Sequence, residues 1–281
     1  MAGCSLTGEA YGKTARGFAR VLTTVGPVTS DDLTARRANS FGANARAYAE
    51  HRPDYPTAAI RWALAPLGPG AHRVLDLAAG TGKLTGGLVA EGHHVTAVEP
   101  DESMLSELVR RHGGVRALPG AAERVPLPDS AVDAVVVGQA FHWFDPVRAM
   151  AEIARVLRPG GVLAGLWNHV DTRVGWVAEF DEVCRSSVRP MGAPGAADDT
   201  MPAHELFEDA EVREFPHRQR RTAETLVETI GTHSHTLVIP REEWARLRRR
   251  ILDFLRSRPE TAEGGFDLPI VTRGKRATRR A

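Results

Sequence analysis

The chain has 281 residues, and its 36 Lys and Arg residues against 35 Asp and Glu residues leave a formal net charge of +1. A charge this close to zero gives no reason to expect nucleic acid or a membrane surface as the main partner. The two cysteines, Cys4 and Cys184, make neither a disulfide framework nor a zinc cluster, which is typical of a reducing cytoplasm. The length is sufficient for one large domain with a substantial core.

Residues 1–39 are expected to be an N-terminal extension, to which the sequence assigns no role. The first twenty-five residues lack the long apolar core of a signal peptide, and no later stretch has about 18 consecutive apolar residues. We therefore expect a cytoplasmic protein. Residues 40–66, which contain NSFGANARAYAEHRPDYP, are expected to be mostly helical.

Residues 73–168 alternate short apolar runs with amphipathic stretches, which is the pattern of successive βα units in a parallel sheet. The apolar runs are rich in Val and Leu with little alternation, as in strands that are covered on both faces. The expected strands are RVLDLA (73–78), HVTAVE (94–99), VRAL (115–118), VDAVVVG (132–138) and GVLAGLWN (161–168).

Two helices of this core can be placed from their first residues. Asp101 is expected to cap the helix after the second strand, and Asp145 with Pro146 to begin the helix after the fourth. The stretch QAFHWFD (139–145) therefore lies on the loop that leaves the carboxyl end of a strand. Open α/β sheets bind ligands at that edge.

Further helices and strands are expected after the core. The stretch RPMGAPGAADDTMPA is typical of an exposed loop. The last nine residues, RGKRATRRA, are strongly basic, and we expect a solvated, frayed terminus in preference to a nucleic-acid-binding tail. The expected elements are a helix near 173–188, a strand near 211–217, helices near 222–232 and 240–257, and a last strand near 266–272.

The first βα junction contains Gly80-x-Gly82, where glycines let the backbone pass close to a ligand. The next strand ends in Glu99, nineteen residues after Gly80, where a carboxylate can accept both hydroxyl groups of a ribose. A dinucleotide turn would have a third glycine at the position of Thr85. Asp76, just ahead of the glycines, would repel a pyrophosphate and attract an ammonium or sulfonium group. The alternatives are a helix-capping role for Asp76 and a surface position for Glu99.

Four motifs in order carry a resemblance to a known family: Asp76 to Lys83, Glu99-Pro100, GAAERVPLPDSAVDAVVVGQAFHWFD and RVLRPGGVLAGLWN. The chain resembles the class I S-adenosylmethionine-dependent methyltransferases, and most of all the branch of trans-aconitate methyltransferase-like and quinone-biosynthesis enzymes. The resemblance covers residues 40–168 well and extends loosely to 273. It implies an α/β fold with a Rossmann-like, seven-stranded, mostly parallel sheet, an antiparallel last strand, helices on both faces and a helical lid.

The same resemblance implies one methyltransferase domain over residues 40–273. It comprises a lid (40–66), a cofactor-binding core (73–168) and substrate-side elements (173–260), and a basic tail (274–281) follows the domain. The cofactor would be S-adenosylmethionine. Its methionine part would lie among Asp76, Ala78, Gly80 and Gly82, its ribose at Glu99, its adenine near Met104, Ala122 and Glu123, and its sulfonium beside Gln139 and Ala140. Pro100 would be a further cofactor-binding residue.

The sequence departs from the family pattern at two of these places. Ala78 replaces the first glycine of the turn, which is acceptable only if that residue keeps a negative φ. Ala121 stands where many relatives have an aspartate, so adenine recognition would depend more on backbone groups or water.

The lid and the aromatic loop supply the candidate acceptor residues. Tyr48, Arg52 and Tyr55 would either pack the entry helix or touch cofactor or acceptor. Phe141, Trp143 and Phe144 would form an aromatic wall that excludes water, with Trp167 beside the site. His142 is either a packed side chain or the general base that takes a proton from the acceptor.

We expect a small-molecule acceptor methylated at a carboxylate or hydroxyl oxygen. The alternative is an enzyme of the same fold that binds the cofactor but catalyses another reaction, such as a cyclisation. Nucleic-acid methylation is disfavoured by the near-neutral charge and by QAFH in place of an N/D-P-P-Y/F-type tetrapeptide. No metal is expected, because neither His93-His94 nor His233-x-His235 has a ligand pattern. No expectation about the oligomeric state follows.

Overall fold

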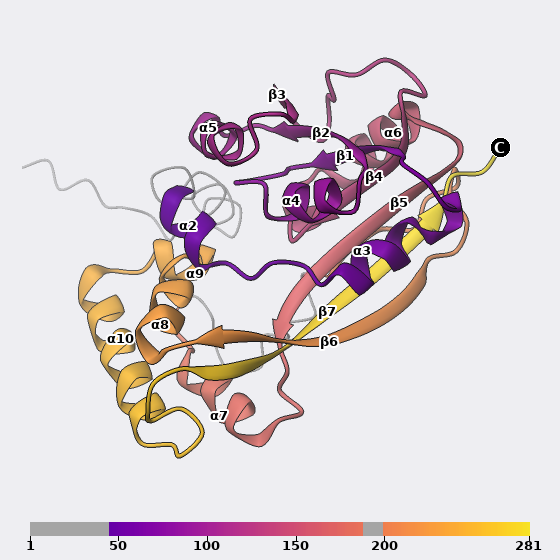
Figure 1. Ribbon diagram of the computed structural model, residues 1–281. Coiled ribbons are helices and arrows are strands. Elements are labelled where there is room, and N and C mark those ends of the chain that lie inside the picture. Colours follow the sequence, from indigo (N-terminus) through magenta and orange to yellow (C-terminus); the bar gives the residue numbers. More distant parts are fainter. Residues whose placement is uncertain (1–44, 188–198) are drawn as a thin grey trace, which may run out of the picture.

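A computed structural model describes residues 45–187 and 199–281. Seven strands form one sheet in the order β3-β2-β1-β4-β5-β7-β6 (Figure 1). The expected extension at 1–39 and most of the expected loop after 188 lie outside these residues. The strands are β1 Arg73–Leu77, β2 His94–Glu99, β3 Arg116–Pro119, β4 Val132–Gly138, β5 Leu157–Val170, β6 Glu211–Arg221 and β7 Phe266–Thr278.

The strand directions agree with the sequence-based expectation. β1 pairs in parallel with β2 and β4, β2 with β3, and β4 with β5. β7 lies antiparallel between β5 and β6, so β7 alone runs against the other strands of this sheet. The Rossmann-like α/β fold with an antiparallel last strand is therefore confirmed.

Both faces of the central strands are buried, which explains their unbroken apolar runs. Leu75 and Leu77 of β1 belong to one core cluster, whereas Val74, on the opposite face, belongs to another. Successive side chains of a strand point to opposite faces, so each strand feeds both clusters. Helices cover both layers, with α3 and α4 on one face and α6 on the other (Figure 1).

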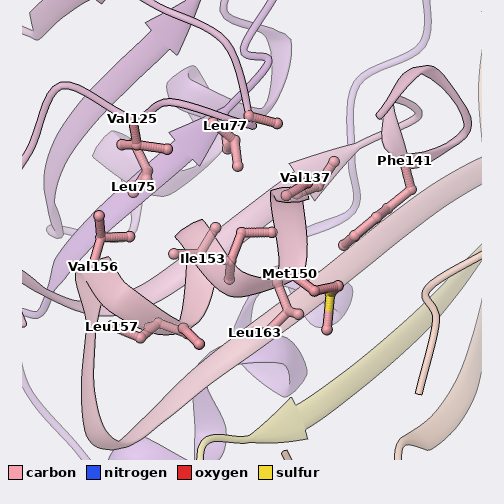
Figure 2. Packing of buried hydrophobic residues seen from close by; sticks show 14 of the residues in the cluster. Leu75, Leu77, Val125, Val137, Phe141, Met150, Ile153, Val156, Leu157 and Leu163 are labelled. Carbon is pink, nitrogen blue, oxygen red and sulfur yellow. The ribbon is translucent and has the colours of Figure 1, made fainter. Parts of the chain in front are cut away.

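Helix α6 shows how the sequence sets one of these layers. Its N-cap is Asp145, whose carboxylate accepts the N–H groups of Val147 and Arg148 at 3.1 Å, as expected. Its apolar face carries Met150 and Ile153, which Figure 2 shows pointing onto the sheet beside the leucine and valine side chains of β1, β4 and β5. The helices of the core are α3 Thr57–Leu64, α4 Lys83–Ala90, α5 Glu102–Arg111 and α6 Pro146–Val156, with short 3-10 turns η2 at Ala65–Leu67 and η3 at Phe141–Trp143.

A third apolar cluster forms where β6 and β7 extend beyond the central sheet. Phe266, Leu268 and Ile270 of β7 pack there against apolar side chains of α7, α8 and α10. Helix α2 lies beside α8, so the start of the described chain meets this outer cluster (Figure 1). These helices are α2 Ala45–His51, α7 Gly175–Val183, α8 Ala223–Gly231, α9 Ser234–Leu237 and α10 Arg241–Arg256.

The basic C-terminal stretch differs from the frayed, solvated terminus that its composition predicts. β7 continues to Thr278, and its backbone is paired on both sides, to β5 and to β6. Arg276 extends over the ring of Trp62 at 4.5 Å and pairs with Glu211 at 2.8 Å. A basic strand is stable here because the long side chains cover apolar surface while their charged ends find partners.

Candidate functional site

The carboxyl ends of β1, β2, β4 and β5 meet at one edge of the sheet. They place Asp76, Glu99, Gly138 and Asn168 near one another, as expected of a ligand site in an open α/β sheet. A pocket lies at this edge, beneath the segment that follows α2. Its lining consists of Tyr48, Arg52, Pro53, Tyr55, Asp76, Ala78, Ala79, Gly80, Thr81, Lys83, Leu84, Gly138, Gln139 and Asn168.

The glycine turn between β1 and α4 is left-handed at three positions. φ is 55° at Ala78, 56° at Gly80 and 84° at Gly82. The expectation of a negative φ at Ala78 is therefore wrong. The turn is fixed on both sides, because the Ala79 N–H donates to the Val98 carbonyl at 3.1 Å and the Gly82 N–H donates back to the Ala79 carbonyl at 3.0 Å. A left-handed alanine costs about 1–2 kcal/mol, so the site holds backbone strain.

Glu99 is tied to this turn by hydrogen bonds. Its Oε2 accepts the Gly80 N–H at 2.8 Å, and its Oε1 accepts the Asp101 N–H at 3.0 Å. The side chain belongs to a residue that is only 7% exposed, and this burial raises the pKa of the carboxyl. Each oxygen keeps a further lone pair. The surface position considered from the sequence is therefore not observed, while ribose binding by Glu99 stays a prediction.

Asp76 lies beneath the turn and is almost wholly buried. Its Oδ2 accepts the hydroxyl of Thr85 at 2.5 Å. Its Oδ1 is buried and has no hydrogen-bond partner within the described chain. Burial, above all, raises the pKa of this carboxyl to about 7. Gly82 is the N-cap of α4, and it makes no side-chain cap hydrogen bond. The unpaired Oδ1 could therefore accept a hydrogen bond from an ammonium group of a ligand.

Residues 45–56, which we name the lid segment, cover the pocket. The Tyr55 hydroxyl lies against Gly138, and burial raises the pKa of Tyr55 well above its usual value. Asp54 holds the segment to both walls: its carboxylate pairs with Lys83 at 3.0 Å, and its carbonyl accepts the Asn168 amide at 3.2 Å. The lid segment therefore contacts the ligand edge, while the role of residues 40–66 as a lid stays a prediction.

The pocket beneath the lid segment is narrow. Its volume is about 50 Å³, whereas sites for drug-sized ligands have about 300–1,000 Å³. A ligand as large as a nucleoside therefore does not fit within this pocket alone. The polar groups that line the pocket can bind the polar groups of such a ligand. The lid segment limits the volume that is open to it.

Most of the aromatic loop packs into the core and not into this pocket. Phe141 is 5% exposed, and its ring lies 5.4 Å from Phe144 and 6.0 Å from the fully buried Trp167. His142 lies on the 3-10 turn with its ring 4.3 Å from that of Trp143. None of these side chains lines the pocket described above. Phe141, expected in the aromatic wall, and Trp167, expected beside the site, are both part of the hydrophobic core.

Gln139 is the member of this loop that does line the pocket. Its φ is 59°, so Gln139, like Ala78, is a non-glycine residue in the left-handed region. Its side-chain amide donates to the Asn168 carbonyl at 2.9 Å, which joins the ends of β4 and β5. Its predicted position beside the sulfonium of the cofactor stays a prediction.

The residues predicted near the adenine lie farther along the sheet edge. Met104 and Ala122 are buried, as is Ala140, which is predicted beside the sulfonium. Pro100, a further predicted cofactor-binding residue, is exposed. The Glu123 carboxylate accepts the Asp145 N–H at 2.8 Å, so it joins two loops at this edge. These residues do not line the narrow pocket, and their contact with the cofactor stays a prediction.

Thr85 and Asn168 are site residues that the sequence did not single out. Thr85 stands where a dinucleotide turn has glycine, and its hydroxyl faces Asp76 one helical turn into α4. Asn168 is a polar residue at the carboxyl end of a core strand, next to Gln139. That position was a usable signal, since polar residues at strand ends on this edge face the ligand site.

The described part of the chain contains no group of three or more His, Cys, Asp and Glu side chains that could hold a metal ion. Nor does that part contain a helix with the length and apolar character needed to cross a membrane.

Known proteins share this arrangement. A family model described as a methyltransferase domain matches residues 75–165. An uncharacterised methyltransferase of Mycobacterium tuberculosis is 41% identical over 240 residues, which cover 85% of this chain and 95% of that protein. The chain belongs to the methyltransferase family. This methyltransferase is an enzyme that uses S-adenosylmethionine, as the glycine turn and the resemblance predict.

Two more comparisons describe this methyltransferase. The solved structure of a protein from Anaeromyxobacter dehalogenans, assigned as a type II methyltransferase, is similar with a TM-score of 0.61 and 27% identity, over 82% of this chain and 97% of that one. The malonyl-[acyl-carrier protein] O-methyltransferase of Methylococcus capsulatus is 40% identical over 123 residues, which are 40% of this chain and 44% of that protein. The trans-aconitate and quinone branch stays a prediction.

Proposed function

We propose that this methyltransferase transfers a methyl group to an oxygen of a small molecule, a carboxylate or a hydroxyl. The observation that carries the proposal is the lid segment over the ligand edge, held there by the contacts of Asp54 with Lys83 and Asn168. A covered site of this kind suits a small acceptor better than a folded macromolecule or a duplex. The partial similarity to an O-methyltransferase supports oxygen as the methylated atom.

The cofactor site is proposed on the residues of the glycine turn. Bound S-adenosylmethionine supplies a methyl group that is activated by its positively charged sulfur. The unsatisfied Oδ1 of Asp76 would hold the ammonium group of its methionine part, and Glu99 would hold the ribose. Gly80 and Gly82 allow the backbone to approach the ligand closely.

The pocket favours an acceptor that needs no strong base. Of the side chains that line it, Tyr55 has a raised pKa and stays a hydrogen-bond donor. Arg52 and Lys83 are cations, and His142 is not among the lining residues. A carboxylate acceptor is already deprotonated at neutral pH, so alignment and water exclusion would supply most of the catalysis.

The proposal is tested by screening acceptors with methyl-labelled cofactor. We expect label to reach at least one carboxylic acid or phenol, and S-adenosylhomocysteine to raise the melting temperature of the wild type. Glu99→Ala should remove most of that thermal shift, while Glu102→Ala, an exposed neighbour on α5, should keep it. Recovery of intact cofactor after turnover of a substrate would contradict methyl transfer and favour another reaction on the same fold.

A further inference from the structure

Three polar side chains form a hydrogen-bonded row across strands β5, β7 and β6. Asn168 of β5 lies directly opposite Thr272 of β7 in the antiparallel register, and His217 of β6 is the diagonal neighbour of Thr272. The Thr272 hydroxyl donates to Oδ1 of Asn168 at 2.5 Å, and Nε2 of His217 lies 2.9 Å from the same hydroxyl. The row ends at the lid segment, because the amide of Asn168 donates to the Asp54 carbonyl at 3.2 Å.

The direction of each hydrogen bond in this row follows from its end at the lid segment. A backbone carbonyl can only accept, so the amide nitrogen of Asn168 faces Asp54 and its oxygen faces Thr272. The Thr272 hydroxyl then donates its single proton to Asn168 and accepts from His217, which therefore carries a proton on Nε2. Each group has one role, so the row permits one orientation of the Asn168 amide.

The centre of the row is shielded from water. Thr272 is fully buried, and burial lowers the pKa of His217, which favours the neutral ring. Phe215 of β6 lies opposite Thr272 and packs against Trp62 of α3, with 5.6 Å between the ring centres. A neutral imidazole still donates from Nε2. Because water has little access here, loss of the Thr272 hydroxyl would leave Oδ1 of Asn168 without a donor in the observed orientation.

Asn168 connects the row to the ligand site. Its side chain lines the pocket together with Gln139, whose amide donates to the Asn168 carbonyl at 2.9 Å. One of the two amide N–H groups of Asn168 donates to Asp54, and the other has no acceptor within residues 45–187 and 199–281. A donor that is oriented before binding can meet a ligand without the cost of ordering its side chain.

We propose that Thr272 and His217 are positioning residues of this methyltransferase, which act through Asn168. They hold the Asn168 amide so that one N–H donates to the lid segment and the other donates to the bound cofactor. This inference rests on the proposed cofactor site, because Asn168 shares the pocket with Asp76 and the glycine turn. A rotated amide would present an oxygen to the Asp54 carbonyl, so it would weaken the contact with the lid segment as well as cofactor binding.

The test measures the dissociation constant of S-adenosylhomocysteine by titration calorimetry on the full chain, well below the melting temperature of every variant. Thr272→Val removes the hydroxyl at nearly constant shape, and we expect the dissociation constant to rise about tenfold. Thr272→Ser keeps the hydroxyl and should stay within about twofold of the wild type. His217→Leu should raise the constant about threefold, since Thr272 can still donate, whereas His217→Gln keeps a donor and should stay within about twofold.

A double-mutant cycle separates action through Asn168 from a general effect on the sheet. Asn168→Ala alone should weaken binding about tenfold. In the Asn168→Ala protein, Thr272→Val should then add less than about twofold, because the amide that it positions is absent. Additive effects of the two substitutions on the dissociation constant would mean that Thr272 acts independently of Asn168, and would overturn the proposal. If Thr272→Val does not fold, His217→Leu takes its place in the same cycle.

Thr261→Val is the matched control for loss of a buried hydroxyl group. Thr261 follows α10, is 2% exposed and does not line the pocket, and its hydroxyl donates to the Leu255 carbonyl at 2.5 Å. Both valine variants should lower the melting temperature, but only Thr272→Val should change the dissociation constant.

Two kinds of failure can be told apart. Normal binding by the wild type with an unchanged constant in Thr272→Val, or with an equal rise in Thr261→Val or Thr272→Ser, overturns this inference alone. Absence of binding by the wild type overturns the proposed cofactor site and this inference with it.

Discussion

The hydroxyl of Tyr55 lies so close to Gly138 that a Cβ atom on Gly138 would stand 2.5 Å from it. The contact joins the lid segment to the end of β4, in the middle of the ligand edge. The glycine is needed here for space, since a methyl group would push the tyrosine and the lid segment outward.

Gly138→Ala should therefore hold the lid segment away from its closed position. We expect the free energy of unfolding to fall by about 1–3 kcal/mol, as for other overpacked sites, and kcat/KM to fall at least tenfold because closure is impaired. Chemical unfolding and steady-state kinetics with the acceptor found by labelling check this expectation. Tyr55→Phe in the same protein removes the nearest atom and should restore part of both losses. Wild-type stability and kinetics in Gly138→Ala would show that the contact is not tight.

The left-handed alanine of the glycine turn gives a second expectation. Ala78→Gly relieves about 1–2 kcal/mol of backbone strain. It also raises the conformational entropy of the unfolded chain, which lowers stability by about 0.4–1 kcal/mol. We therefore expect the free energy of unfolding to stay equal or to rise by up to about 1.6 kcal/mol. Ala79→Gly is the matched control, because Ala79 is not among the residues with positive φ, and it should lower stability. Urea unfolding of the two variants decides, and equal losses in both would contradict strain at Ala78.

The raised pKa of Asp76 makes stability depend on pH. The pKa is about 7 in the folded protein against an ordinary value of 3.8, so between these values the folded state binds more protons than the unfolded state. The contribution of Asp76 to stability is therefore greatest below about pH 4 and is lost as the pH rises to about 7. Asp76→Asn removes this contribution, so the difference in unfolding free energy between the variant and the wild type should grow in favour of the variant over that range. If the unfolding free energies of the two proteins changed equally with pH, a group other than Asp76 would cause the pH dependence.

The same carboxyl should control cofactor affinity. The ionised form attracts the ammonium group of S-adenosylhomocysteine, so affinity should rise as the pH increases through about 7 and should be about tenfold weaker one unit below the pKa. Titration calorimetry at pH 6 and pH 8 measures this change. Asp76→Asn should bind weakly at both values, and an equally steep pH dependence in that variant would exclude Asp76 as its source.

Removal of the His142 side chain should have little effect on catalysis. Since its ring packs against Trp143 and does not line the pocket, His142→Ala should keep kcat within about threefold, far from the ~10²–10⁴-fold loss that removal of a general base brings. Initial rates with labelled cofactor measure the effect. A loss of a hundredfold with an unchanged melting temperature would restore His142 as a base that the lid movement brings into reach.

The sequence predicts the parts of the site that local rules control. Asp76 and Glu99 follow from strand ends and a glycine turn, and the caps Asp101 and Asp145 are where the sequence places them. These features depend on neighbours within a few residues and on the rule that parallel strands end at one edge.

Such rules do not predict which residues of distant segments contact each other. Arg221 meets His51 across 170 residues, and nothing near Arg221 distinguishes it from the solvated arginines that precede it. The φ of Ala78 depends on the hydrogen bond that Ala79 makes to the neighbouring strand. The residue type alone therefore predicted a negative φ where the observed φ is positive. The end of β7 was missed because its alternation of basic and small residues lacks the apolar pattern of a buried strand.

The position of β7 between β5 and β6 constrains how the protein is made. On the ribosome β6 emerges before β7, yet within the described sheet its ladder is formed with β7 alone. Until β7 arrives, β6 and the free side of β5 are open strand edges, which are sites for mispairing with other chains. The arginine on β6 and the helices that follow it reach the lid segment only once that strand is inserted. The acceptor side of the enzyme is therefore expected to assemble last, after the cofactor half of the sheet has folded.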